Sequence, residues 1–469
     1  MKSIKLVFLI ALKQEVPEFL SSTTGCAITT LKALLANDYR IVDDASISVL
    51  AIVTGVGHTL SIEAATWVKD HLNPYQVINL GSAGSQSKQF AMGNLVVVSS
   101  VTSNESPPIT CLDRLPVLGT IMKDVSLVRL GSVLQIGDAI ESDIVDMEAY
   151  WQAQGFADTS IAFSSLKYIT DTNDAITGCN VAKQLPYLRD CFNDFFQPIA
   201  DRLNKSLDYS ITVVIPTYNR SLLLVRAVES VLEQTYPCEC IVVDDASTDD
   251  TLDQLRVFAN RIQILSFPQN KGVSEARNKG VLAAKTEWIA FLDSDDVWKP
   301  DKLINQVAYL KQHPLFDITQ CDEAWIRDDK PKQKKVYHLK QEGWFFKESL
   351  ERCLISPSAV LLTKRLFNAY HGFNQQFPAC EDYDLWCYLT RDYPVGFNAN
   401  IDMIKYAGHA NQLSERPFLD QYRLKTLTSL LNQETNALYS SYIEAVLDRK
   451  QAIVDQGKLK RISRTALGV

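Results

Sequence analysis

Three clusters of carboxylate and hydroxyl side chains follow short apolar runs in the second half of the chain. They are Pro216–Asn219, Asp244–Ser247 and Asp293–Asp296. Each preceding run has the length and composition of a buried strand. In a doubly wound α/β sheet, ligands bind beyond the carboxyl ends of the strands. We therefore expect the three clusters to converge on one edge of a sheet.

The third cluster, Asp293–Asp296, predicts a divalent metal site that serves a sugar diphosphate. A sugar diphosphate carries concentrated negative charge, which carboxylates alone would repel. Mg²⁺ or Mn²⁺ takes oxygen ligands and bridges them to phosphate. Such a cation would stabilise the nucleoside diphosphate as it leaves. Acidic loop tips are common, so the interpretation depends on the three clusters together.

The motifs of this half resemble those of the family 2 glycosyltransferases of the GT-A fold. They occur in the family's order at Ile215–Arg220, Val242–Asp249, Asn270–Asn278 and Phe291–Asp296. The resemblance covers about Ser210–Leu430. It implies a nucleotide-sugar donor, with a UDP-sugar as the family-level expectation, and inversion at the anomeric carbon. The donor sugar and the acceptor, a glycan or another molecule, stay open.

The same resemblance implies roles for individual residues. Tyr218 and Asp245 would bind the base of the donor nucleotide, and Asp244 would support their turn. Arg277 would lie in the segment that faces the donor phosphates. Asp293 and Asp295 would form the metal-binding DxD-type element, with Asp295 as the direct metal ligand.

Inversion requires a general base that deprotonates the acceptor hydroxyl. The segment that matches the family is Cys380–Trp386, in which Asp382 is the predicted base and Glu381 the alternative. Carboxylates are also favoured at helix N-termini, so an acidic helix start is the competing structural interpretation.

Three further motifs resemble one bacterial subgroup of the family, namely Glu323–Arg327, Ile355–Ser358 and Gly408–Ser414. We expect them to shape the acceptor side. Trp325 and Trp386 could stack on sugar faces there, or could belong to an aromatic core. His409 could reach the metal or the diphosphate, or could be a structural histidine.

A different set of glycines and carboxylates marks the first half. Glycine turns follow apolar runs at Thr54–Gly57 and Asn79–Ser85, Asp146–Ala149 opens a predicted helix, and Ile169–Asp174 ends a strand. In this order the motifs resemble the nucleoside phosphorylase superfamily. The closest resemblance is to the methylthioadenosine/S-adenosylhomocysteine nucleosidases, over about Met1–Ala200.

This second resemblance implies a catalytic set for a purine nucleoside. Glu15 matches the residue that positions the attacking water, Met147 and Glu148 match the ribose contacts, and Asp171 matches the acid that protonates the purine. Cleavage builds positive charge on ribose and negative charge on the base, so carboxylates and an acid placed there lower the barrier. Few arginines lie in the expected phosphate loops, which favours hydrolysis over phosphorolysis. A non-catalytic module that binds nucleosides or forms a homodimer is the alternative.

The elements that must position both sets alternate strands with helices. In the first half we expect strands at Lys5–Leu12, Ser48–Thr54, Val77–Leu80, Leu95–Val101 and Ser165–Thr170, with helices at His58–His71 and Val145–Gln154. In the second half we expect strands at Ile211–Ile215, Cys240–Val243, Ile262–Ser266 and Trp288–Leu292, with helices at Leu222–Gln234 and Ser274–Ala284. This alternation predicts largely parallel sheets.

The predicted organisation is two α/β domains with a helical tail. A nucleoside phosphorylase-like domain spans residues 1–207, a Rossmann-like GT-A domain spans 208–430, and the tail spans 431–469. A chain of 469 residues is long enough for two or three domains.

Composition limits the partners and the compartment. The net charge of −8 gives no reason to expect nucleic acid. No apolar run approaches the roughly 20 residues that cross a bilayer. The ten cysteines form no disulfide framework, which favours reduced thiols and a cytoplasmic protein. Near the end, Lys458, Lys460, Arg461 and Arg464 could form a peripheral membrane contact or a solvated face.

Overall fold

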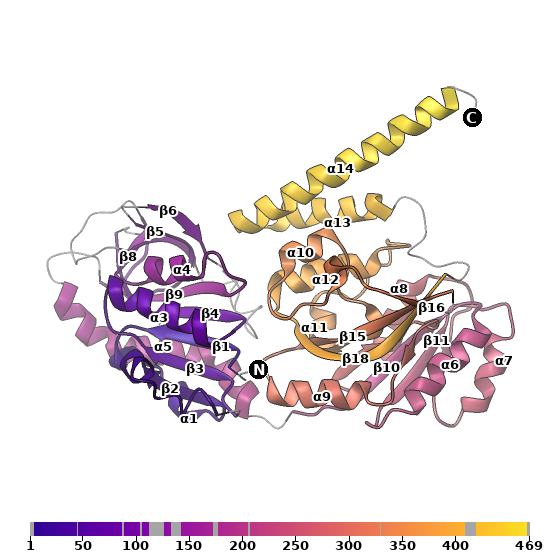
Figure 1. Cartoon of the computed structure of the whole chain (residues 1–469), viewed down its shortest axis with the longest axis horizontal. Helices are drawn as coiled ribbons and strands as arrows, with labels where there is room; N and C mark the ends of the chain where they lie inside the picture. The colour runs from indigo at the N-terminus through magenta and orange to yellow at the C-terminus, as the bar shows by residue number, and fades with distance from the viewer. Residues whose placement is uncertain are drawn as a thin grey trace. The chain divides into compact units, whose positions relative to one another are not determined.

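The structure is a computed structural model that describes residues 4–44, 46–86, 89–103, 106–111, 126–132, 142–171, 177–204, 207–328, 330–408 and 419–466. The chain divides into two compact units. The first comprises Met1–Leu207 with Gln312–Leu315, and the second comprises Asp208–Lys311 with Phe316–Val469. Each unit has its own sheet and its own helices (Figure 1). The expectation of two α/β domains is therefore confirmed.

The first unit contains a mixed sheet with a parallel centre. Its strands are β1 (Leu6–Ile10), β2 (Cys26–Thr30), β3 (Val49–Val53), β4 (Gln76–Ser85), β5 (Leu95–Ser103), β6 (Ser106–Thr110), β7 (Ser126–Ser132), β8 (Ile144–Asp146) and β9 (Ala162–Asp171). Their order is β2-β3-β1-β4-β8-β7-β5-β6, and β9 pairs with β4 and β5. Strand β1 is parallel to β3 and β4, and β4 is parallel to β9. Antiparallel pairs join β4 to β8 and β5 to β6 and β9.

Helices cover the two faces of this sheet. They are α1 (Phe19–Ser22), α2 (Leu31–Leu35), α3 (His58–His71), α4 (Ala149–Phe156) and α5 (Thr177–Asn204). One apolar cluster joins Trp67 of α3 and Tyr150 of α4 to the sheet. Another joins Phe196 of α5 to Phe8 of β1, with ring centroids 5.0 Å apart. The sheet is thus buried on both sides, which is why its central strands are continuously apolar.

Two sequence expectations for this unit were wrong in detail. The predicted helix Val145–Gln154 begins only at Ala149, because Val145 lies in β8 and the Asp146 carboxylate accepts the Ala149 N–H at 3.0 Å. The predicted glycine turn at Asn79–Ser85 is instead part of β4. Those residues continue the parallel ladder with β9, which supplies the backbone hydrogen bonds that keep them extended.

The sheet of the second unit places four parallel strands side by side. The strands of this unit are β10 (Ile211–Thr217), β11 (Glu239–Asp244), β12 (Gln263–Ser266), β13 (Trp288–Phe291), β14 (Val297–Trp298), β15 (Ile318–Arg327), β16 (Lys330–Lys332), β17 (Val360–Thr363) and β18 (Gly396–Ala407). Their order is β12-β11-β10-β13-β17-β15-β18-β14, and β16 pairs with β15. Strands β10 to β13 are parallel, so the carboxyl ends of β10, β11 and β13 meet at one edge.

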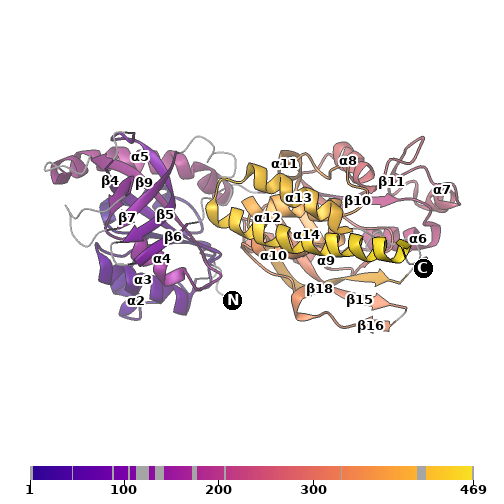
Figure 2. The ribbon, with the colours of Figure 1, turned by 90° about the horizontal axis from the view of Figure 1, so that it is seen from above.

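The helices of the second unit are α6 (Ser221–Leu232), α7 (Thr251–Leu255), α8 (Val273–Ala283), α9 (Lys302–Gln312), α10 (Phe346–Glu351), α11 (Lys364–Ala369), α12 (Glu381–Asp392), α13 (Leu419–Gln433) and α14 (Ala437–Ala466). Helix α8 approaches β10 closely at Gly280, where an added Cβ would lie 2.3 Å from a Val214 methyl group. Only glycine permits that approach. Figure 2 shows α13 and α14 lying over α10 and α12.

Among the helices of the described residues, none combines the length and the apolar character needed to span a membrane.

Candidate functional site

A cavity of about 1480 Å³ opens at the carboxyl edge of the second unit's parallel strands. All three clusters contribute to it, through Pro216–Asn219, Asp245 and Asp293–Asp296. The start of α8, the start of α12, the β15–β16 hairpin, the segment 352–357 and the end of β18 also line it. The clusters therefore converge, because strands that run parallel bring their carboxyl ends to one edge.

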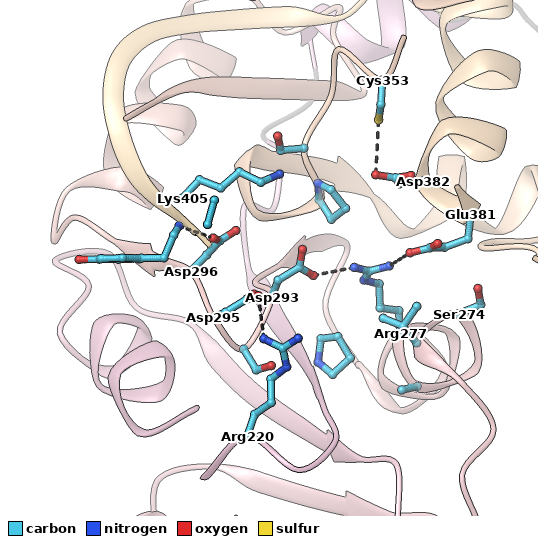
Figure 3. Close-up of a pocket in the computed structure, with 18 of the residues that line it drawn as sticks. Arg220, Ser274, Arg277, Asp293, Asp295, Asp296, Cys353, Glu381, Asp382 and Lys405 are labelled. Carbon is cyan, nitrogen blue, oxygen red and sulfur yellow. Dashed lines mark hydrogen bonds and ion pairs between the residues drawn. The ribbon is translucent and has the colours of Figure 1, made fainter. Parts of the chain in front are cut away.

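Arg277 joins two parts of the cavity wall (Figure 3). One amino group of its guanidinium donates to Asp293 at 2.6 Å, and the other donates to Glu381 at 2.7 Å. Its side chain is 4% exposed and lies 4.9 Å from the centroid of the Phe373 ring. Burial opposes the charge, but the two carboxylates raise the pKa of Arg277. Both amino groups are thus committed to protein carboxylates, whereas the sequence suggested that Arg277 lies in the segment facing the donor phosphates.

The other two carboxylates of the Asp293–Asp296 cluster have different partners. Asp295 forms an ion pair with Arg220 at 2.8 Å. Asp296 is buried and accepts from the Ser358 hydroxyl at 2.7 Å and from the Tyr406 N–H at 3.2 Å. Burial and the charge of Asp295 raise the pKa of Asp296. Asp296 therefore shapes the wall, whereas Asp293 and Asp295 are 27% and 16% exposed toward the cavity.

The exposed aspartates fit a hard divalent cation. Asp293 and Asp295 offer only carboxylate oxygens, which Mg²⁺ and Mn²⁺ prefer. Within the described ranges no three His, Cys, Asp or Glu side chains cluster as a complete protein cage. One or two carboxylates with substrate phosphates and water suit Mg²⁺ in such sites. The two side chains are held in place by Arg277 and Arg220.

The two acidic residues at the start of α12 lie in different surroundings. Glu381 is buried and is bound to Arg277, and its pKa is raised by burial and by the charge of Asp382, against the effect of Arg277. Asp382 is half-buried and lines the cavity, where it accepts the Tyr383 N–H at 2.7 Å and the Cys353 thiol at 3.4 Å. Of the two base candidates, only Glu381 is committed to an arginine.

The residues expected at the nucleotide base hold the loops of the cavity. The Asp245 carboxylate accepts the N–H groups of Lys271 and Gly272 at 2.6 and 2.7 Å, so it fixes the start of α8. Asp244 lies outside the cavity lining and accepts the Ser247 N–H at 3.3 Å, which closes its own turn. Tyr218 lines the cavity and is 43% exposed.

The two tryptophans expected on the acceptor side lie in different surroundings. Trp386 is 1% exposed and packs edge-on against Phe373, so it belongs to the core. Trp325 lines the cavity, and its Nε1–H donates to Glu323 at 2.8 Å. The sequence left both alternatives open for each residue. Burial assigns Trp386 to the core, and stacking on a sugar stays a prediction for Trp325. His409 lies outside the described residues.

Two lysines of the cavity were missed by the sequence reasoning. Lys340 is 3% exposed and forms an ion pair with Glu323 at 3.1 Å. Lys405 extends from β18 into the cavity (Figure 3). Burial opposes its charge, but the carboxylates of Glu323 and Asp296 raise its pKa. The available signal was that Lys405 lies three residues before Gly408, the first residue of an already noted motif.

In the first unit the structure brings Glu15 to the end of β4. Glu15 is 2% exposed, and one of its oxygens accepts the N–H and the hydroxyl of Ser82 at 3.1 and 2.7 Å. Asp171 is buried at the end of β9, where it pairs with Gly84 in the β4–β9 ladder and accepts the Thr170 hydroxyl at 2.9 Å. Glu15 and Asp171, the two predicted catalytic carboxylates, therefore both lie next to the carboxyl end of β4.

Glu148 belongs to the same buried charge group. It is 7% exposed and accepts the Gly57 N–H at 3.3 Å. Burial and the charges of Asp146 and Glu15 raise the pKa of Glu148 to about 7, against the effect of Lys167. Lys167 forms a buried ion pair with Asp146 at 2.8 Å. Met147 lies half-buried between β8 and α4.

Comparison with known proteins identifies one family in the second unit. Residues 212–362 match the family model described as Glycosyl transferase family 2. The glucosyltransferase WfgD of Escherichia coli, named for UDP-Glc and α-D-GlcNAc-diphosphoundecaprenol, is 30% identical over 225 residues. That match covers 46% of this chain and 84% of WfgD.

An uncharacterised glycosyltransferase of Rickettsia felis is 26% identical over 266 residues, which is 55% of this chain. The chain spans only 42% of the length of that relative.

Solved structures match each half of the chain. S. aureus TarS in complex with UDP-GlcNAc has a TM-score of 0.44 at 18% identity, and the match covers 51% of this chain and 72% of TarS. The methylthioadenosine/S-adenosylhomocysteine nucleosidase of Helicobacter pylori has a TM-score of 0.35 at 15% identity, and the match covers 43% of this chain and 99% of the nucleosidase. In the second half, the family model and the E. coli relative name the family that the sequence motifs had indicated.

Proposed function

The chain belongs to glycosyl transferase family 2, and we propose that its second unit transfers a glycosyl group from a nucleotide sugar to an acceptor hydroxyl. The observation that carries the proposal is the ion-pair chain Asp293–Arg277–Glu381. It ties the metal-binding aspartates to the start of α12, where Asp382 faces the same cavity. Donor activation and acceptor deprotonation thereby share one site.

Asp382 is the general base of this proposal. It accepts the proton of the acceptor hydroxyl while that oxygen bonds to the anomeric carbon from the side opposite the leaving group. The bond between the anomeric carbon and the diphosphate oxygen breaks, and its electron pair leaves with the nucleoside diphosphate. The configuration inverts in consequence. Glu381 is a positioning residue, because it is committed to Arg277.

Asp295 and Asp293 would hold Mg²⁺ or Mn²⁺, which neutralises the charge that develops on the leaving diphosphate. Arg220 and Arg277 keep the two carboxylates aimed at the cavity. Tyr218 and the loop held by Asp245 form the nucleotide side. The names of WfgD and of the TarS complex support a UDP-sugar donor.

The test is release of UDP from UDP-glucose and UDP-N-acetylglucosamine by the whole chain with Mn²⁺. Asp382→Asn should reduce turnover by about 10²–10⁴-fold, the range for a lost general base. Asp295→Asn should abolish the dependence on Mn²⁺. The matched control is Asp253→Asn, whose side chain is 65% exposed and forms a surface ion pair with Arg256. Full turnover in Asp382→Asn would refute the assigned base.

A second function, hydrolysis of purine nucleosides by the first unit, is favoured by the buried group of Glu15, Glu148 and Asp146 around Lys167. In this step water bonds to the anomeric carbon and gives a proton to Glu15, the N-glycosidic bond breaks, and the base leaves with the proton that Asp171 provides. The test is adenine release from methylthioadenosine and S-adenosylhomocysteine by the wild type and by Asp171→Asn. Binding without release would favour the alternative of a nucleoside-sensing or dimerisation module.

A further inference from the structure

The cavity of the second unit contains a cationic and aromatic row that the transfer step does not use. Its members are Lys332 of β16, Trp325 of β15 and Lys405 of β18, and all three line the cavity. Trp325 pairs with Lys332 in the β15–β16 ladder and with Lys405 in the β15–β18 ladder. Residues paired across neighbouring strands point to the same face of a sheet. Both lysines therefore flank the tryptophan on the cavity side.

The spacing of this row suits a small polar ligand. Adjacent strands lie about 4.8 Å apart, so the two lysine Cα atoms are separated by roughly 10 Å. That separation accommodates one sugar ring over the indole, with an anionic substituent within reach of a lysine. The Trp325 ring is fixed from two sides, because its Nε1–H donates to Glu323 and His338 lies 4.7 Å from it, centroid to centroid.

The two lysines of the row carry their positive charge in different surroundings. Lys405 lies near the carboxylates of Glu323, Asp296, Asp293 and Asp382, which favour its charged form, and Glu323 also forms an ion pair with Lys340 at 3.1 Å. Lys332 is exposed at the edge of the cavity. Arg352 adds a third cation to this wall, held 4.3 Å from the centroid of the Tyr337 ring.

The row extends toward both the proposed metal site and the proposed base. Trp325 lies on β15, two strands from β13, whose end carries the proposed metal ligands. The negative charges of Asp296, Asp293 and Asp382 all act on Lys405. A ligand on the row would thus lie near the proposed base and the proposed metal ligands, where an acceptor must meet the donor.

We propose that Lys332, Trp325 and Lys405 bind a phosphorylated saccharide as the acceptor, with the sugar on the indole and the phosphate on the lysines. The proposal rests on the glycosyl transfer proposed for this cavity. Arg352 strengthens the attraction of the phosphate. The phosphate can belong to a soluble sugar phosphate or to a lipid-linked sugar, and the chemistry recognised is the same.

The test measures binding of glucose 1-phosphate and of glucose to the whole chain saturated with UDP and Mg²⁺, by ³¹P and ¹H NMR titration. Glucose 1-phosphate should bind at least about tenfold more tightly than glucose, because hydrogen bonds to charged groups contribute about 1.5–3 kcal/mol. Lys332→Met and Lys405→Met should each remove about tenfold of that affinity and leave UDP affinity unchanged. Trp325→Ala should weaken both sugars.

Lys335→Met is the matched control, because Lys335 lies in the same segment, is exposed and is outside the cavity lining. It should bind glucose 1-phosphate as the wild type does. Lys332 is also exposed, so its variant keeps the test decisive even where Lys405→Met fails to fold.

Equal affinity for glucose and glucose 1-phosphate would overturn the proposal. So would a loss of UDP binding in Lys405→Met with glucose 1-phosphate binding intact, because the lysine would then serve the donor. Wild-type protein that fails to bind UDP would refute the proposed transfer itself. Phosphatidylcholine vesicles with and without a polyprenyl glucosyl phosphate separate the sources: tighter binding to the doped vesicles assigns the lipid-linked sugar, and equal binding assigns the soluble one.

Discussion

Two buried glutamates, one in each unit, show how the surroundings set the charge of a carboxylate. Glu148 of the first unit and Glu323 of the second are 7% and 3% exposed. Burial raises the pKa of both, yet Glu148 reaches about 7 whereas Glu323 lies at about 2. Near Glu148 the carboxylates of Asp146 and Glu15 add to burial, and Lys167 opposes them while bound to Asp146. Around Glu323 the nearby cations outweigh burial.

The cations around Glu323 explain its low pKa. Lys340 forms an ion pair with it at 3.1 Å, Lys405 adds positive charge, and Trp325 donates a hydrogen bond at 2.8 Å. The first unit therefore keeps a carboxyl that can change protonation near neutral pH. The second keeps a permanent carboxylate that orders the wall of its cavity. Burial alone therefore does not set the pKa of a carboxyl group. Neighbouring carboxylates raise that pKa further, whereas neighbouring cations lower it.

Lys340→Met is expected to have the largest effect on the free energy of unfolding. It would leave the Glu323 carboxylate buried without its ion-pair partner, which costs about 3–5 kcal/mol. Urea unfolding followed by hydrogen exchange in β15 should report the loss. The double variant Lys340→Met with Glu323→Gln should regain part of the lost stability. An unchanged midpoint of urea unfolding in Lys340→Met would show that the ion pair with Lys340 does not stabilise Glu323.

Lys167→Met should act in the same way in the first unit, at the lower end of that range. Removing a partner of a buried pair costs about 3 kcal/mol. Because Lys167 lowers the pKa of Glu148, the variant should also raise that pKa above its value of about 7. Carboxyl titration by ¹³C NMR measures the shift. A lower pKa in the variant would contradict the charge assignment around Glu148.

Nucleoside binding should follow the titration of Glu148. The carboxyl is neutral below a pKa of about 7 and charged above it, and only the charged form accepts strongly from ribose hydroxyls. Affinity for methylthioadenosine should therefore rise about tenfold between roughly pH 6 and pH 8. Asp146, Lys167 and Glu15 are the charged groups around it. Glu148→Gln should give a flat profile, and a wild-type affinity that falls with pH would reverse the argument.

The contribution of Glu323 to stability changes with pH over a lower range than nucleoside binding at Glu148 does. Its folded pKa is lowered, so the contribution is fully present above the ordinary glutamate pKa of about 4.3 and is lost as the pH falls toward about 2. Hydrogen exchange in β15 at decreasing pH should show this loss in the wild type. The loss should be absent in the variant Glu323→Gln.

Arg256→Ala should have the smallest effect. Arg256 pairs with Asp253 at 3.1 Å, and the two side chains are 80% and 65% exposed. Exposed pairs contribute only about 0–1 kcal/mol, because solvent screens them. Thermal unfolding should therefore match the wild type closely. A loss of stability as large as that expected for Lys340→Met would mean that burial does not explain the difference in strength between these two ion pairs.

Local patterns were sufficient to place several elements. The predicted helix His58–His71 coincides with α3, and the predicted strands at Ile211–Ile215 and Trp288–Leu292 differ from β10 and β13 by one or two residues at their ends. Helix and strand periodicities arise from neighbours in the chain, so they can be followed without tertiary information. The convergence of the motifs after β10, β11 and β13 follows from the parallel order of these strands.

Sequence alone thus determined which residues are candidates for the chemistry: the strand-end aspartates, the acidic start of α12 and the carboxylates of the first unit. Only the tertiary structure decided their partners. Arg277 meets Glu381, which is 104 positions away, and Lys332 and Lys405 meet at Trp325 through the register of three strands. Such contacts join segments that are distant in the chain, and a shift of one residue in register would turn each lysine to the opposite face. Composition and local periodicity contain no information about that register, which packing of the whole sheet determines.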